Sequence, residues 1–145
     1  MPDCVLDAAV VYFANGELAG RRSGNALDRR LSVIEQAARG IWRIRYNPKL
    51  LGEYQRLIQE SRNDVIDLFF ILLDSEHAFF VKRNTLSGPQ YEIAIKKCRW
   101  PSHDQHLLAA ALGGDRPTVF VSEARHVACA KKILARFAVR VTRLG

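Results

Sequence analysis

Residues 117–141 read PTVFVSEARHVACAKKILARFAVRV, and this stretch decides the class of the fold. The β-branched and aromatic residues of 118–121 are typical of a buried strand, and 138–141 form a second short apolar run. Residues 124–137, which lie between them, predict a helix. A strand, a helix and a strand in succession indicate two parallel strands joined by a helix that covers one face of their sheet.

The same alternation continues upstream of this stretch. Asn47-Pro48 marks a helix start, because asparagine caps a helix and proline suits its first position. The predicted strands are residues 5–11, 41–46, 78–81 and 91–95, the last two around a turn at 86–89, and the predicted helices are 25–39, one from Pro48, 65–73 and 102–112. We therefore predict an α/β fold, a three-layer sandwich with a central parallel sheet flanked by helices, with residues 1–145 as one domain.

Composition limits the classes of function. The 145 residues carry a formal net charge of +7, which favours contact with the phosphates of nucleic acid. The three cysteines form no CxxC pair, so a zinc ribbon is not expected, and a reducing, cytoplasmic setting is the simplest interpretation. The longest apolar stretch, 68–73, is too short to span a membrane, and we expect no secretory signal and no membrane partner.

Four acidic residues interrupt otherwise apolar patterns. Asp7 closes the apolar run of residues 4–6 and Glu123 follows the strand 118–121, both at expected carboxyl ends of strands, where ligand sites of open α/β sheets lie. Glu53 and Asp104 lie beside the apolar stripes of their helices. Buried carboxylates need a cation, and oxygen ligands without cysteine favour Mg²⁺ or Mn²⁺. Three of the four also have an ordinary explanation: a helix N-terminus favours Asp104, Glu53 can be an exposed helix residue, and an acid in a loop such as Glu123 is common. Asp7 is harder to explain in this way, since a carboxylate at the end of a buried strand seldom serves packing.

The order of these acids resembles that of a PIN domain. The resemblance lies in residues 4–7 (CVLD), 47–54 (NPKLLGEY), 98–111 (CRWPSHDQHLLAAA) and 118–122 (TVFVS). It implies an RNA-cutting enzyme in which Asp7, Glu53 and Asp104 hold Mg²⁺ or Mn²⁺, with Glu123 as a fourth acid. Ser122 would orient the attacking water, or else only bond the backbone at a strand end.

The chain departs from the family pattern at two places. Ala8 and Ala9 stand where PIN domains usually have a Thr or Ser and then an Asn or Ser. Ala124 stands at the family's fourth acid, with Glu123 one residue earlier. Either Glu123 reaches the metal through its longer side chain, or the site has three acids.

Basic residues near the motifs are the candidates for RNA binding, although each can equally be a solvated surface charge. They are Lys82, Arg83, Lys97, Arg99 and Arg125. Trp100 would stack a base or, more simply, anchor the core. His103 and His106 lie three residues apart and could hold a metal, but a capping or surface role is the simpler explanation.

Stand-alone PIN domains are often the toxins of bacterial toxin–antitoxin pairs, which usually form homodimers and are silenced by a small antitoxin protein. The resemblance therefore implies RNA, an antitoxin and a second copy of the chain as partners. The alternative is a PIN-like module that has lost catalysis and binds RNA or protein through its basic surface.

Overall fold

Five parallel strands form the centre of the computed structural model, which describes residues 1–16 and 25–144. In chain order they are β1 Asp3–Leu6, β2 Arg43–Tyr46, β3 Ala78–Phe80, β4 Thr118–Val121 and β5 Arg140–Arg143. Their order in the sheet is β3-β2-β1-β4-β5, so the first strand of the chain is the central one. Every residue of β1 and β4 is buried, as expected for parallel strands that are covered on both faces.

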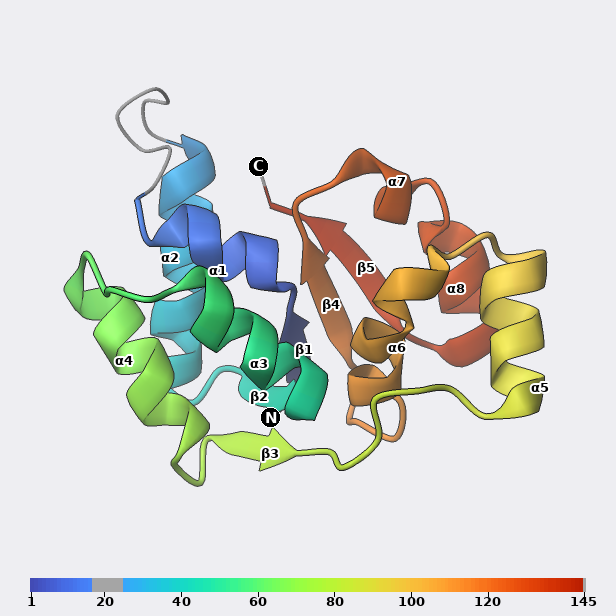
Figure 1. Cartoon of the computed structure of the whole chain (residues 1–145), viewed down its shortest axis with the longest axis horizontal. Coiled ribbons are helices and arrows are strands. Elements are labelled where there is room, and N and C mark those ends of the chain that lie inside the picture. Colours follow the sequence, from blue (N-terminus) through green and yellow to red (C-terminus); the bar gives the residue numbers. More distant parts are fainter. Residues whose placement is uncertain (17–24, 145) are drawn as a thin grey trace.

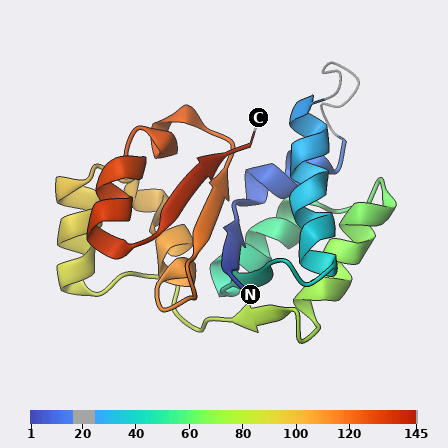
Figure 2. The same cartoon turned by 180° about the vertical axis from the view of Figure 1, so that it is seen from behind.

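Helices cover the sheet on both sides, which confirms the predicted three-layer α/β arrangement (Figure 1). α6 packs on β1, β2 and β4, while α2 packs against α1 and α4 (Figure 2). The helices are α1 Ala8–Ala14, α2 Asn25–Ala38, α3 Pro48–Leu57, α4 Asp64–Leu73, α5 Gly88–Tyr91, α6 Gln105–Ala111, α7 Ala124–Val127 and α8 Ala130–Phe137. Within the described ranges, none of them combines the length and apolar character needed to cross a bilayer.

A buried ion-pair network holds the amino end of the sheet. Asp3 on β1 accepts from Arg43 on β2, with Nε 2.8 Å from Oδ1, and also from the backbone N–H of Asp115. Arg45, which is 3.6 Å from Asp3, donates to the carbonyl groups of Ala110 and Leu112 at the end of α6. These bonds fix α6 on the sheet, and α6 begins beside the candidate site.

The prediction of one strand over residues 5–11 is wrong. The strand ends at Leu6, and the rest of the apolar run forms α1, with Val10, Val11 and Ala14 buried. A short apolar run does not distinguish a buried strand from a buried helix, because both faces are apolar in either case. The junction between strand and helix falls at Asp7.

The predicted strand at 91–95 is also wrong. Ser87 accepts from the backbone of Gln90 and the Gln90 side chain accepts from the backbone of Ser87, which is a capping box that opens α5. A wider helical turn, Glu92–Lys97, continues it, with the Cys98 N–H bonded to the Ile93 carbonyl. From the sequence alone, the same serine and proline predict a turn between strands.

The last predicted elements are correct in type, with two changes. The predicted helix over 124–137 is interrupted at residues 128–129 and forms α7 and α8, and the final strand begins at Arg140 instead of residue 138. Ala138 ends α8 in the left-handed region, with φ of 56°, which turns the chain into β5.

Candidate functional site

Asp7 lies at the carboxyl end of the central strand, in the position that ligand sites of parallel sheets occupy. Its backbone N–H donates to the Phe120 carbonyl on β4, at 3.0 Å. Burial and the negative charges of Asp104 and Glu53 raise its pKa from 3.8 to about 6, although His126 acts in the opposite direction. Three of the four predicted acids, Asp7, Glu53 and Asp104, are therefore within electrostatic reach of one another.

Glu53 reaches this place from α3. The Asn47 side chain caps that helix by accepting from the Leu50 N–H, at 3.1 Å, as the sequence predicts. Tyr54, which is fully buried, donates its hydroxyl to the carbonyl of Leu6, the residue before Asp7. Because Tyr54 fastens α3 to the end of β1, the neighbouring Glu53 is held beside Asp7.

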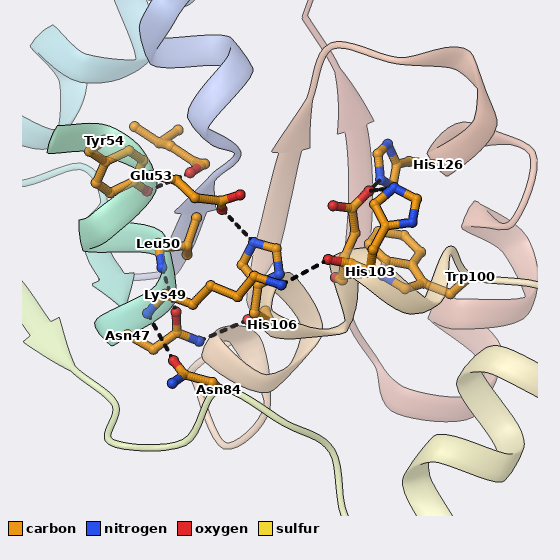
Figure 3. A network of polar contacts seen from close by, with 12 residues as sticks. Asn47, Lys49, Leu50, Glu53, Tyr54, Asn84, Trp100, His103, His106 and His126 are labelled. Carbon is orange, nitrogen blue, oxygen red and sulfur yellow. Dashed lines mark hydrogen bonds and ion pairs between the residues drawn. The ribbon is translucent and has the colours of Figure 1, made fainter. Parts of the chain in front are cut away.

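The Glu53 carboxylate is paired with a buried histidine. Oε1 of Glu53 lies 2.7 Å from Nε2 of His106 on α6 (Figure 3). His106 is 1% exposed, whereas the Glu53 side chain keeps 25% of its surface in solvent. The Asn47 amide also donates to the His106 carbonyl, at 2.9 Å, so that one side chain joins the start of α3 to the start of α6.

Asp104 is surrounded by positive or hydrogen-bonding groups. Its Oδ2 lies 2.8 Å from Nε2 of the buried His126, 3.4 Å from Arg125 and 3.5 Å from the exposed His103. Burial raises the pKa of Asp104, but the hydrogen bond and charge of His126, together with the charges of His103 and His106, outweigh that effect, so that the pKa is lowered overall. Asp104 is therefore a stable anion at neutral pH.

Glu123 is placed differently from the other three acids. Its Oε2 is 2.6 Å from Nε of Arg125, its side chain is half exposed, and it is not among the charges that shift the pKa of Asp7. Ser122 is buried at the end of β4, and its hydroxyl has no hydrogen-bond partner among the described residues. The expectation that this hydroxyl simply bonds the backbone is therefore wrong.

The predicted RNA-binding residues are all exposed, which fits either expectation for them: Lys82, Arg83, Lys97, Arg99 and Arg125. Of these, Arg125 contacts an acid of the site. Trp100 is 1% exposed, its indole N–H donates to the Asp104 carbonyl, and its ring lies 4.8 Å from that of His126. The interpretation of Trp100 as a packing anchor is correct, and its buried ring does not stack a base.

The sequence did not reveal that two buried histidines, His106 and His126, contact the acids. From the sequence, His106 was considered only as a possible metal ligand together with His103. In the structure the ring of His106 contacts Glu53, whereas the ring of His103 lies near Asp104. Glu53 and His106 are 53 residues apart in sequence, and Asp104 and His126 are 22 residues apart, so no local spacing reveals either pair. A histidine next to the apolar Leu107, inside a helix that is otherwise buried, was the available signal.

The site has the oxygen donors that a hard cation prefers, but they do not form a complete set of ligands. Among residues 1–16 and 25–144, no three His, Cys, Asp or Glu side chains meet closely enough to hold a metal ion as they stand. The histidine pairs use only Oε1 of Glu53 and Oδ2 of Asp104, which leaves the second oxygen of each carboxylate for another ligand. Glu53 and Asp104 place their negative charges close enough to Asp7 to raise its pKa. Carboxylate oxygens of this kind are the ligands that Mg²⁺ and Mn²⁺ prefer.

The chain matches no family model, no curated protein and no solved structure. The likeness to PIN domains therefore rests on the sequence motifs and on the fold class alone.

Proposed function

We propose that this protein is a metal-dependent endoribonuclease of the PIN type, with Mg²⁺ or Mn²⁺ held by Asp7, Glu53 and Asp104. One observation carries the proposal: burial and two neighbouring carboxylates raise the pKa of Asp7 to about 6 at the carboxyl end of the central strand. Like charges gathered in a partly buried place are unfavourable unless a cation offsets them, and such arrangements concentrate at functional sites.

A bound divalent ion would lower the pKa of a water molecule and offset the charge of the scissile phosphate. The chain's own residues would hold the cation and accept the proton that the attacking water releases. Attack of water at phosphorus would break the bond between phosphorus and the 3′ oxygen. That oxygen would take up a proton and become a 3′-hydroxyl, and the other product would carry a 5′-phosphate. Arg125, beside Asp104, is placed to contact a phosphate of the same strand.

The basic character of the chain supports RNA as the substrate. Lys82 and Arg83 follow the carboxyl end of β3, at the same edge of the parallel sheet as Asp7, and both are exposed. The net charge of +7 adds a general attraction for phosphates. We further propose that the protein acts as a toxin silenced by an antitoxin and forms a homodimer, as toxins of the PIN type usually do.

A second candidate function is an RNA-binding module without catalysis. The observation that favours it is that Glu53 and Asp104 already pair with protein groups, His106 in one case and His126 with Arg125 in the other. Among the described residues no finished metal-ligand group accompanies them. In that function the acids serve the packing of α3 and α6, and the exposed basic residues bind RNA.

Cleavage of a mixed RNA pool with Mn²⁺ or Mg²⁺ separates the two candidates. We expect wild type to release products with 5′-phosphates, and Asp7→Asn and Asp104→Asn to reduce the rate at least about 100-fold, since each removes a charge that the cation needs. Asp67→Asn, in an exposed aspartate of α4, is the matched control and should keep the rate.

Intact RNA with folded, metal-supplied wild type would exclude the nuclease. If that protein still binds RNA, and Asp104→Asn binds it equally well, the module function replaces the enzyme.

A further inference from the structure

Two buried histidines hold two of the candidate ligands in the same way. Nε2 of His106 lies 2.7 Å from Glu53, and Nε2 of His126 lies 2.8 Å from Asp104. Each side chain is 1% exposed, and each contact joins two elements that are distant in the chain, α3 with α6 and the start of α6 with α7. Figure 3 shows the two imidazoles apart from each other, with the ring of His106 turned toward Glu53.

Packing alone does not explain these imidazoles. A carboxylate only accepts hydrogen bonds, so each Nε2 is the donor. Nδ1 of both rings is buried without a hydrogen-bond partner among the residues that the structure describes. A buried polar atom without a partner costs about 1–3 kcal/mol, a cost that a leucine of similar size would not carry. Something other than filling space therefore accounts for a histidine at both positions.

Each ring is held to its carboxylate through Nε2 alone, because Nδ1 has no partner among the described residues. The one hydrogen bond orients the carboxylate and leaves its second oxygen for a cation.

We propose that His106 and His126 are positioning residues, which fix Glu53 and Asp104 by one oxygen each so that the other oxygen binds the divalent cation. This inference rests on the proposed function. Hydrogen-bonded partners that orient metal ligands in this way typically contribute about 10–100-fold to metal affinity. The two pairs leave Asp7 as the ligand without a histidine.

The test uses a donor-preserving and a donor-removing variant at each position. Glutamine can place an amide N–H close to where imidazole Nε2 donates, whereas leucine fills the space without donating. The variants are His106→Gln, His106→Leu, His126→Gln and His126→Leu. His77→Leu is the matched control, because it removes an imidazole next to β3 whose ring contacts no carboxylate among the described residues.

The readout is the Kd for Mn²⁺ alone, measured by titration calorimetry on the whole chain, with a thermal melt to show that each variant is folded. We expect both leucine variants to weaken Mn²⁺ binding by about 10–100-fold, and both glutamine variants to recover most of that loss. His77→Leu should bind as wild type does. If a leucine variant does not fold, methionine replaces it in the same comparison, since its unbranched chain adapts to irregular apolar sites.

The possible results separate this inference from the proposed function. Wild-type Mn²⁺ binding that both leucine variants retain would overturn the positioning role and leave the metal site standing. Equal losses in the glutamine and leucine variants would also overturn it, because donation would then not be the cause. A wild type that binds no Mn²⁺ overturns the metal site and the positioning role together.

Discussion

At the scale of single residues, Asp7 carries the largest consequence. It was predictable from the sequence as an acid that ends an apolar strand, and its neighbours Glu53 and Asp104 were predictable from the order of the motifs. The histidines that hold those neighbours were not, because a hydrogen bond between residues 53 positions apart depends on how α3 and α6 pack. Local pattern thus indicates which residues are chemically unusual, and tertiary packing decides what each one touches.

The raised pKa of Asp7 predicts a dependence of stability on pH. Because the folded state holds this proton more tightly than the unfolded chain, the contribution of Asp7 is neutral below its ordinary pKa and becomes unfavourable as pH rises through about 6. A rise in pKa from 3.8 to about 6 corresponds to about 3 kcal/mol lost above that range. Asp7→Asn should therefore be more stable than wild type at pH 8 and similar to it at pH 4.

Urea unfolding in EDTA at pH 4, 5, 7 and 8 checks this prediction. Asp67→Asn, which changes an exposed aspartate, should shift the free energy of unfolding little at any of these pH values. Equal stability of Asp7→Asn and wild type across the whole series would show that Asp7 is not under electrostatic stress. A gain in stability joined to a loss of cleavage is what a functional site predicts, since such sites retain unfavourable charges for their chemistry.

At the scale of elements, the sequence was informative where periodicity and capping agree. Asn47-Pro48 specified the start of α3, and the strands β2, β3 and β4 lie within the predicted ranges. It was misleading at 5–11 and 91–95, where short apolar runs satisfy a buried helix as well as a strand. Asp7 was nevertheless identified as the acid that closes the apolar run of residues 4–6, and β1 does end at Leu6.

Asn47 connects two elements of the site and predicts an effect beyond ordinary helix capping. Its Oδ1 accepts from Leu50, while its amide donates to the carbonyl groups of His106 and Arg83. Asn47→Asp keeps the cap and loses both amide donations. We expect about 1–3 kcal/mol of lost stability, because two carbonyl groups lose their donor. We also expect weaker Mn²⁺ binding, because one of the hydrogen bonds that join α3 to α6 beside Glu53 is lost.

Asn63 offers a matched control for this prediction. It caps α4 through Ile66 and donates its amide to the Ala14 carbonyl, away from the acids. Asn63→Asp should lose comparable stability in urea unfolding while it keeps wild-type affinity for Mn²⁺. If the two variants weaken Mn²⁺ binding equally, Asn47 has no role particular to the site.

At the scale of the whole molecule, the two ends of the parallel sheet carry different groups of charged residues. The amino end is held by Asp3 and its two arginines, and the carboxyl end gathers the acids. Positive charge is present at both ends, so the net charge of +7 does not by itself say where RNA binds. The position of each basic residue relative to the acids must therefore decide where RNA binds.

The last prediction tests which end binds RNA. Lys82 and Arg83 lie at the carboxyl end of the sheet, and the matched pair Arg116 and Arg140 lies at the amino end, before β4 and at the start of β5. Each lysine or arginine that neutralises a phosphate of a single strand contributes about 0.7 to the slope of log affinity against log salt.

Fluorescence anisotropy with a labelled RNA oligonucleotide, without divalent ions, measures that slope between 50 and 300 mM salt. Changing Lys82 and Arg83 to glutamine should lower the slope by about 1.4, whereas changing Arg116 and Arg140 should leave it unchanged. The reverse result would place RNA at the end away from the acids, and an RNA bound there could not present its phosphates to Asp7, Glu53 and Asp104.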